Sequence, residues 1–95
     1  MGRHLLSFDW APDGSKVVYA AQKSSAGRDA FHVDIYEADL TSGRETPLVA
    51  QPGQDLAPAY SRDGSLVAFY SQRGALSYFG ERQVGIVPSG GGTIR

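Results

Sequence analysis

The chain repeats one pattern after fifty residues. Residues 8–19 read FDWAPDGSKVVY and residues 58–69 read PAYSRDGSLVAF. In both copies an aromatic residue in the third position is followed by an Asp-Gly pair and a short apolar run. Asp and Gly favour tight turns, because an Asp side chain hydrogen-bonds the backbone two residues on and Gly tolerates a positive φ. Each copy therefore predicts two strands joined by a turn, and the duplication predicts two copies of one structural unit.

The first unit contains four predicted strands. Two of them flank the turn, and the second of these is apolar on both faces, which indicates that it is covered on both sides. The third is rich in β-branched and aromatic residues, and the fourth contains Pro47, which favours an edge position. Residues 23–30 are polar and aperiodic, so we expect an exposed loop there. The predicted strands are residues 4–10, 16–22, 32–40 and 46–49, with a turn at 41–44.

The second unit follows the same order. A loop over residues 51–55 connects the units, and a second long loop covers residues 73–81. A turn at 89–92 precedes Thr93-Ile94-Arg95, which would begin a fourth strand. The second unit therefore lacks most of its last strand. Its predicted strands are residues 56–61, 66–72 and 83–88.

The whole pattern indicates an all-β fold. No helical periodicity is sustained along the 95 residues, a length that suits one small domain. We expect residues 1–50 to form the first unit and residues 51–95 the second, incomplete one. Apolar residues on both faces of the strands favour stacked sheets.

Composition excludes several classes of protein. The chain has no Cys, so a disulfide framework and a thiolate metal site are excluded and no compartment is indicated. The net charge is −1 and the basic residues are scattered, which gives no support for binding to nucleic acid or to a membrane surface. A content of 41% hydrophobic residues is typical of a globular protein.

The repeated stretch resembles the WD-like repeat of TolB-type β-propellers. In that family a Trp-Ser-Pro-Asp-Gly box lies between the inner two strands of each blade, and residues 10–14 here read Trp-Ala-Pro-Asp-Gly. Residues 34–40, with the Gly-bearing turn that follows them, also match. The same repeat builds the N-terminal propeller of dipeptidyl aminopeptidases and acylaminoacyl peptidases of the prolyl oligopeptidase group. The second copy departs from the box, because Tyr60 and Arg62 replace the Trp and the Pro.

The resemblance implies two four-stranded antiparallel β-propeller blades, the second one incomplete. Rings of this family contain about six to eight blades, and repeat folds generally need about three units for a stable core. Three explanations remain open. The chain is part of a longer propeller, or it is a short unit whose copies together complete a ring, or it is an unrelated small β-domain that shares the hairpin. The missing last strand also leaves an edge that a neighbouring chain could fill.

Asp13 and Asp63 are the most prominent polar candidates. Each could hold a cation or face a ligand, or could accept hydrogen bonds within its own turn. The turn role is favoured because each Asp directly precedes a Gly. A sialidase-type Asp box is excluded, since it needs Ser, Asp and Gly at alternate positions. We therefore expect Asp13, Gly14, Asp63 and Gly64 to be structural turn residues.

No motif in the chain indicates catalysis, a cofactor or a metal. A serine hydrolase would need a Gly-x-Ser-x-Gly turn, which the sequence lacks. His4 and His32 are the only histidines, and a metal site needs three or more convergent ligands. Residues 89–92 read Ser-Gly-Gly-Gly but lack the Lys and the helix of a phosphate-binding loop. We expect no enzymatic activity, no cofactor and no bound metal.

Recurring aromatic residues predict where the blades meet. Five of them occupy strand positions, where aromatic side chains usually form core rather than a ligand platform. Tyr78 and Phe79 lie instead in the second long loop, where they are candidates for contact with a partner. The predicted inter-blade core residues are Trp10, Tyr19, Tyr36, Tyr60 and Phe69.

These observations predict a non-catalytic β-propeller segment that acts as a structural or protein-interaction scaffold. We expect completion by self-association into a ring of about six or eight blades, or by further blades of a longer parent. Blade faces and open strand edges would form a homo-oligomer, with a peptide or protein as a candidate ligand. The alternative is a substrate-gating propeller fragment of a prolyl-oligopeptidase-type serine peptidase whose hydrolase domain lies outside this sequence.

Overall fold

The computed structural model describes residues 4–22, 32–50, 53–71 and 83–94. The two long loops predicted at 23–30 and 73–81 lie outside the described residues. The candidate partner contacts Tyr78 and Phe79 lie outside them as well.

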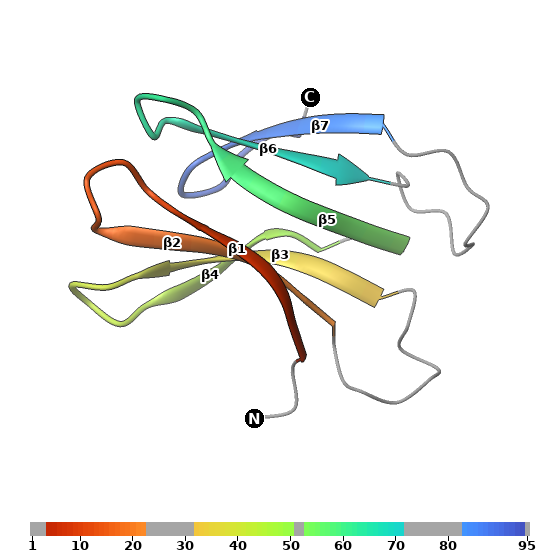
Figure 1. Ribbon diagram of the computed structural model, residues 1–95, viewed down its shortest axis with the longest axis horizontal. Coiled ribbons are helices and arrows are strands. Elements are labelled where there is room, and N and C mark those ends of the chain that lie inside the picture. Colours follow the sequence, from red (N-terminus) through yellow and green to blue (C-terminus); the bar gives the residue numbers. More distant parts are fainter. Residues whose placement is uncertain (1–3, 23–31, 51–52, 72–82, 95) are drawn as a thin grey trace.

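Seven strands form two antiparallel sheets within the described residues (Figure 1). The first sheet has four strands in sequential order and the second has three, so the all-β prediction is confirmed. Within each sheet every strand pairs with the next along the chain, as in a meander. The strands are β1 (His4–Trp10), β2 (Lys16–Gln22), β3 (His32–Asp39), β4 (Glu45–Val49), β5 (Gly53–Tyr60), β6 (Leu66–Ser71) and β7 (Gln83–Pro88).

Most strand bounds agree with those predicted, and β5 differs most. β1, β2 and β7 have the expected ends, whereas β5 begins at Gly53, in the segment predicted as a connecting loop. Its first residues pair in parallel with the start of β3, His32 with Gly53 and Val33 with Gln54. This tertiary pairing has no signal in local residue pattern. A further strand was expected to begin at Thr93-Ile94-Arg95, but Thr93 and Ile94 form no strand, and Arg95 lies outside the described residues.

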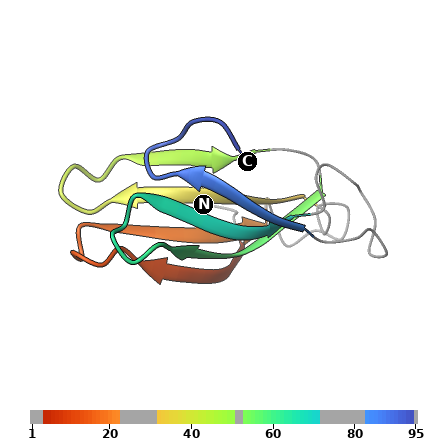
Figure 2. The same cartoon turned by 90° about the horizontal axis from the view of Figure 1, so that it is seen from above.

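The two sheets lie face to face and are joined near both ends. Figures 1 and 2 show the second sheet over the first, with the strands of both running along the long axis. The parallel pairing of β3 with β5 joins the sheets at one end. At the other end the two hairpin turns meet, because a Cβ placed on Gly64 would lie 3.2 Å from Cδ of Pro12. We call the two sheets the first and second blade.

The two Asp-Gly turns have the same backbone structure. The N–H of Gly14 donates to the carbonyl of Ala11 at 2.9 Å, and the N–H of Gly64 donates to the carbonyl of Ser61 at 2.9 Å. Gly14 has φ 76° and Gly64 has φ 78°, in the left-handed region that favours glycine. The sequence repeat is therefore a structural repeat.

The hydrophobic core fills the space between the blades. Period-2 alternation places one set of side chains from each strand in this layer, and the opposite set faces away from the other blade. Both blades contribute fully buried branched residues. The cluster contains Val18, Ala20, Val33, Ile35, Leu48, Val49, Val67, Phe69 and Val87, with Leu56 and Tyr60 packed against it.

The prediction that Trp10, Tyr19 and Tyr36 pack between the two blades is wrong. Trp10 is 55% exposed, on the face of β1 that points away from the second blade. Tyr19 lies on the same outer face and stacks on its cross-strand partner Tyr36, with ring centroids 5.6 Å apart. The reason is that equivalent side chains of the two repeats point in the same direction. Tyr60 and Phe69 of the second blade therefore reach the core, whereas their equivalents Trp10 and Tyr19 face outward.

Gly85 makes room for Phe69 in the second blade. The two residues are cross-strand partners, and a Cβ on Gly85 would lie 2.6 Å from Cζ and 2.8 Å from Cε2 of the Phe69 ring. We expect Gly85→Ala to lower the free energy of unfolding by about 1–3 kcal/mol, as overpacking of a dense core does. Chemical denaturation measures this change.

The matched control is the double variant Gly85→Ala with Phe69→Leu, which removes the ring that the new methyl group meets. The two changes should be less destabilising together than the sum of their separate effects. Strictly additive effects would show that the ring does not constrain position 85.

Candidate functional site

A buried carboxylate on the first blade binds the second blade. Glu37 is only 4% exposed and lies two residues before the end of β3. Its Oε2 accepts hydrogen bonds from the hydroxyls of Tyr60 and Ser89, each at 2.7 Å, and its Oε1 accepts one from the N–H of Gly90 at 2.8 Å. All three donors belong to the second blade or to the turn that follows it. We call these four residues the Glu37 clasp.

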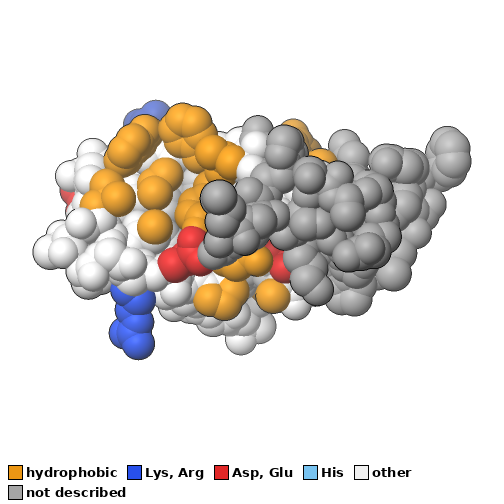
Figure 3. All heavy atoms as spheres, turned by 90° about the horizontal axis from the view of Figure 1, so that it is seen from below, with side chains coloured by type: hydrophobic (Ala, Val, Ile, Leu, Met, Phe, Trp, Pro, Cys, Tyr) orange, Lys and Arg blue, Asp and Glu red, His pale blue; other side chains and the backbone are white. Residues whose placement is uncertain are grey.

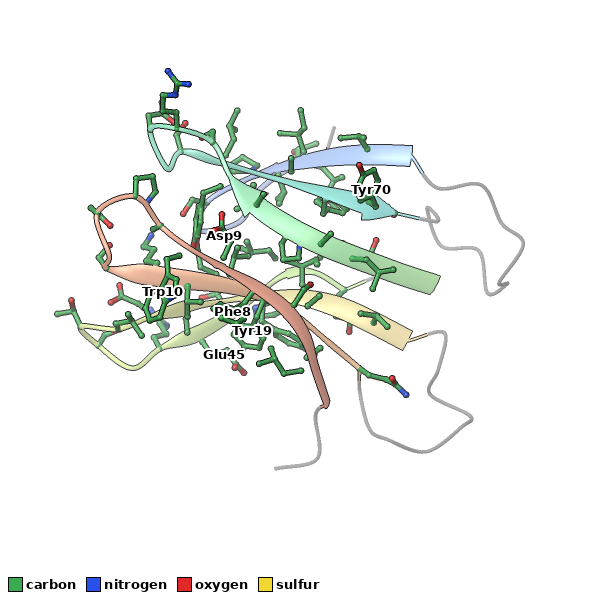
Figure 4. The ribbon with its side chains drawn as sticks, viewed as in Figure 1. Phe8, Asp9, Trp10, Tyr19, Glu45 and Tyr70 are labelled. Atoms are coloured by element: carbon green, nitrogen blue, oxygen red, sulfur yellow. The ribbon has the colours of Figure 1, made fainter. Side chains whose placement is uncertain are left out.

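A second carboxylate supports the same junction. Oδ2 of Asp9 accepts a hydrogen bond from the N–H of Tyr60 at 2.9 Å. Figure 4 shows Asp9 directed from β1 toward the second blade, whereas Phe8 and Trp10 lie on the other side of that strand. Burial of the Tyr60 hydroxyl, its hydrogen bond to Glu37 and the charge of Glu37 raise the pKa of Tyr60 well above its usual value. Tyr60 therefore remains a hydrogen-bond donor at any ordinary pH.

Sequence reasoning missed both carboxylates. Glu37 continues the period-2 series of Val33 and Ile35, which are fully buried. A carboxylate at the third position of such a series must be paired when it is buried, and this signal could have identified Glu37. Asp9 has no comparable signal, because its partner is a backbone N–H fifty-one residues away.

An apolar hollow lies on the outer face of the first blade. Its volume is about 470 Å³, and Figure 3 shows hydrophobic side chains gathered around it. Phe8 is 56% exposed and Trp10 55%, although both are large aromatic residues. We call this surface the first-blade face. It is lined by Leu5, Phe8, Trp10, Val17, Tyr19, Ala21 and Glu45, of which Glu45 is the charged member.

The outer face of the second blade is also apolar. Tyr70 is 52% exposed and Val84 is 57% exposed on the adjacent strands β6 and β7. A shallower hollow of about 200 Å³ lies beside them. We call this surface the second-blade face. The residues around its hollow are Ala57, Ala59, Ala68, Phe69, Tyr70 and Val84. The chain thus presents one exposed apolar face on each outer side, and such faces mark interaction surfaces.

Asp13 and Asp63 each bind within their own turns. Oδ1 of Asp13 accepts from the N–H and the hydroxyl of Ser15, at 2.9 and 2.7 Å. Oδ1 of Asp63 accepts from the N–H of Ser65 at 3.0 Å and from the hydroxyls of Ser65 and Ser61, each at 2.8 Å. These contacts, the N–H of the following Ser first, lower the pKa of Asp13 and lower that of Asp63 to about 2. Both carboxylates serve as hydrogen-bond acceptors for the turn.

The described ranges contain no cluster of metal-binding side chains. The side chains of His4 and His32 lie outside the described residues. Among the side chains that the structure does describe, no three His, Cys, Asp or Glu residues are placed to hold a metal ion. The described strands and turns include no helix of the length and apolarity that a membrane-spanning helix requires.

Comparison with known proteins identifies relatives of the chain. No protein-family model matches it. Dipeptidyl-peptidase 5 of Porphyromonas gingivalis is 37% identical over 70 residues, and an uncharacterised protein of Agrobacterium fabrum is 35% identical over 75 residues. These matches cover 70% and 77% of this chain but only 10% and 24% of those proteins. The chain therefore spans at most about a quarter of the curated relatives it matches.

A solved structure gives the same result over nearly the whole chain. The structure of a TolB candidate from Agrobacterium tumefaciens matches with a TM-score of 0.71 and 31% identity, covering 99% of this chain and 29% of that one. Together with the two stacked blades, this match defines the chain as a β-propeller repeat unit. It carries two consecutive repeats of the TolB type, so the resemblance of its sequence to that family is confirmed.

The geometry of the Glu37 clasp predicts that the hydroxyl of Tyr60 contributes measurably to the free energy of unfolding. Tyr60→Phe removes the hydrogen bond to Oε2 of Glu37 and leaves the ring in the core. We expect the free energy of unfolding to fall by about 1.5–3 kcal/mol, the range for hydrogen bonds to charged groups. Chemical denaturation followed by circular dichroism measures the change.

Tyr70→Phe is the matched control, because it removes the same group from an exposed position on the second-blade face. It should change stability little. Equal effects of the two substitutions would show that the clasp does not hold the blades together.

The lowered pKa of Asp63 predicts that the stability of the fold depends on pH. Because its pKa is about 2 in the folded chain and 3.8 ordinarily, the ionised group stabilises the fold fully above pH 3.8. This contribution is lost as the pH falls toward 2. We expect the NMR signal of its carboxyl carbon to titrate near pH 2, and Asp63→Asn to weaken the acid dependence of the melting temperature. A midpoint near 3.8 would contradict the turn geometry.

Proposed function

We propose that the chain is a non-catalytic scaffold segment of a β-propeller, completed to a ring either by copies of itself or by further blades of a longer parent. The observation that carries this proposal is the pair of exposed apolar faces, one on each outer side of the blade pair. In a closed propeller every blade face is covered by a neighbouring blade. When a subunit has an apolar face at each end, copies related by closed rotational symmetry bury both faces against each other.

The partial coverage of the relatives supports the same view. The matched residues make up 24% of the Agrobacterium fabrum protein and 29% of the TolB-type structure, so both relatives extend well beyond two blades. The repeats of this chain are therefore of a kind that occurs with other blades around it. The partner that covers each face has the chemistry of another blade.

A second function is favoured by one comparison. The similarity to dipeptidyl-peptidase 5 supports a role as the substrate-gating propeller segment of a serine peptidase. Such a segment would guide peptides toward a hydrolase domain and would itself perform no chemistry. A reading frame that continues through further blades into a Gly-x-Ser-x-Gly domain would favour this function over the first.

The solution mass of the chain tests completion by self-association. We expect light scattering to give about 30 or 40 kDa, which is three or four copies of 10.1 kDa and makes a ring of six or eight blades. The physical reason is the burial of the two apolar faces on assembly. A folded species of 10.1 kDa at all concentrations would refute completion by copies of this chain.

A further inference from the structure

We propose that the first-blade face of one copy docks on the second-blade face of another copy, head to tail, in the same geometry as the internal junction between the two blades. The inference rests on the proposed function and specifies its partner, orientation and contact residues. A second copy is the occupant because the repeat itself supplies both halves of the contact.

The repeat makes the two outer faces equivalent to the two halves of the internal junction. Trp10 pairs with Val17 across its hairpin as Tyr60 pairs with Val67, so Trp10 is the equivalent of Tyr60. Trp10 points away from the second blade and Tyr60 points toward the first, so both side chains point in the same direction relative to their own blade. The first-blade face is therefore equivalent, in the repeat, to the surface with which the second blade binds the first.

The other half of the junction is found on the second-blade face. Val18 pairs with Glu37 as Ala68 pairs with Ile86, so Ile86 is the equivalent of Glu37. In the same way Asp9 pairs with Val18 as Ala59 pairs with Ala68. The second-blade face thus has Ile86 and Ala59 where the first blade has its two clasping carboxylates.

The donors of the clasp have changed together with the acceptors. The N–H of Leu40 donates to the carbonyl of Ser15 at 2.9 Å, as the N–H of Ser89 donates to that of Ser65, so Leu40 is the equivalent of Ser89. Leu40 is 50% exposed. The internal junction joins the polar side chains of Glu37, Tyr60 and Ser89, whereas the outer faces offer Ile86, Trp10 and Leu40 at the same three places.

This coordinated replacement identifies the partner. A buried carboxylate needs donors and an apolar side chain needs apolar neighbours, so each set is complementary within itself. Trp10 and Leu40 would face an unpaired carboxylate on a blade with a clasp, but they face Ile86 on the second blade of another copy. The outer contact is therefore specific for head-to-tail docking. Two copies joined face to like face would not bring Trp10 and Ile86 together.

The contact is heterologous, so each copy uses both faces and the assembly continues until the rotation closes. Two single variants separate the faces. Trp10→Glu places a charge on the first-blade face and Val84→Glu places one on the second-blade face. Both positions are more than half exposed, so the fold of each subunit should persist, as circular dichroism can verify. We expect each variant alone to be monomeric by light scattering.

Mixing the two variants gives the decisive measurement. The Trp10→Glu subunit keeps an intact second-blade face and the Val84→Glu subunit keeps an intact first-blade face. The mixture should therefore form a dimer of one copy of each variant, near 20 kDa from 10.1 kDa per copy, and should not grow further. Ser42→Glu is the matched control and should assemble like the wild type, because Ser42 is an exposed turn residue whose equivalent Gly91 has nothing within 4 Å of a Cβ placed on it.

The outcomes distinguish this inference from the function on which it rests. A monomeric wild type refutes completion by self-association, and the head-to-tail contact with it. A wild type that assembles while the mixed variants stay monomeric refutes the head-to-tail contact alone. Loss of assembly with Trp10→Glu but not with Val84→Glu would show that like faces pair, which also overturns the inference.

Discussion

The structure depends on one buried carboxylate. Glu37 lies beside the hydrophobic core cluster, and its desolvation is compensated because the second blade supplies two hydroxyls and a backbone N–H. Apolar packing between two twisted sheets tolerates sliding, since it has little directional preference. The three hydrogen bonds on Glu37, with the one on Asp9, select a single relative position of the blades. Removal of the second blade would leave Glu37 exposed among Val and Ile side chains.

Local sequence pattern predicted the elements well and their contacts less well. The Asp-Gly turns, the period-2 strands and the duplication define the all-β blades, because each of these signals arises from neighbouring residues. The early start of β5 depends on pairing with β3, to which local pattern is blind. The turn role of Asp63 was predictable from a Gly one residue away, whereas the role of Glu37 depends on donors 23, 52 and 53 residues distant.

The exposure of Trp10 also could not be predicted from local sequence pattern. Its residue type and its place in the repeat box indicate a core residue, and its equivalent Tyr60 is packed against the core. Trp10 is exposed because no blade precedes β1 among the residues described here. The type of a residue indicates whether a repeat usually buries it. Whether it is buried in one particular copy depends on whether a neighbouring repeat packs against it. The two copies also differ in a coordinated way. The internal junction has the polar residues Glu37, Tyr60 and Ser89, and the equivalent positions on the outer faces have Ile86, Trp10 and Leu40.

The contact between the two Asp-Gly turns affects the angle between the two blades. Gly64 approaches Cδ of Pro12 so closely that a methyl group could not fit without movement, while β3 and β5 share backbone hydrogen bonds at the opposite end. The wedge angle between successive blades is thereby fixed at two separate points. Because a full turn divided by this angle gives the number of blades in a closed circle, the small size of Gly64 would help to set the number of blades in the proposed ring.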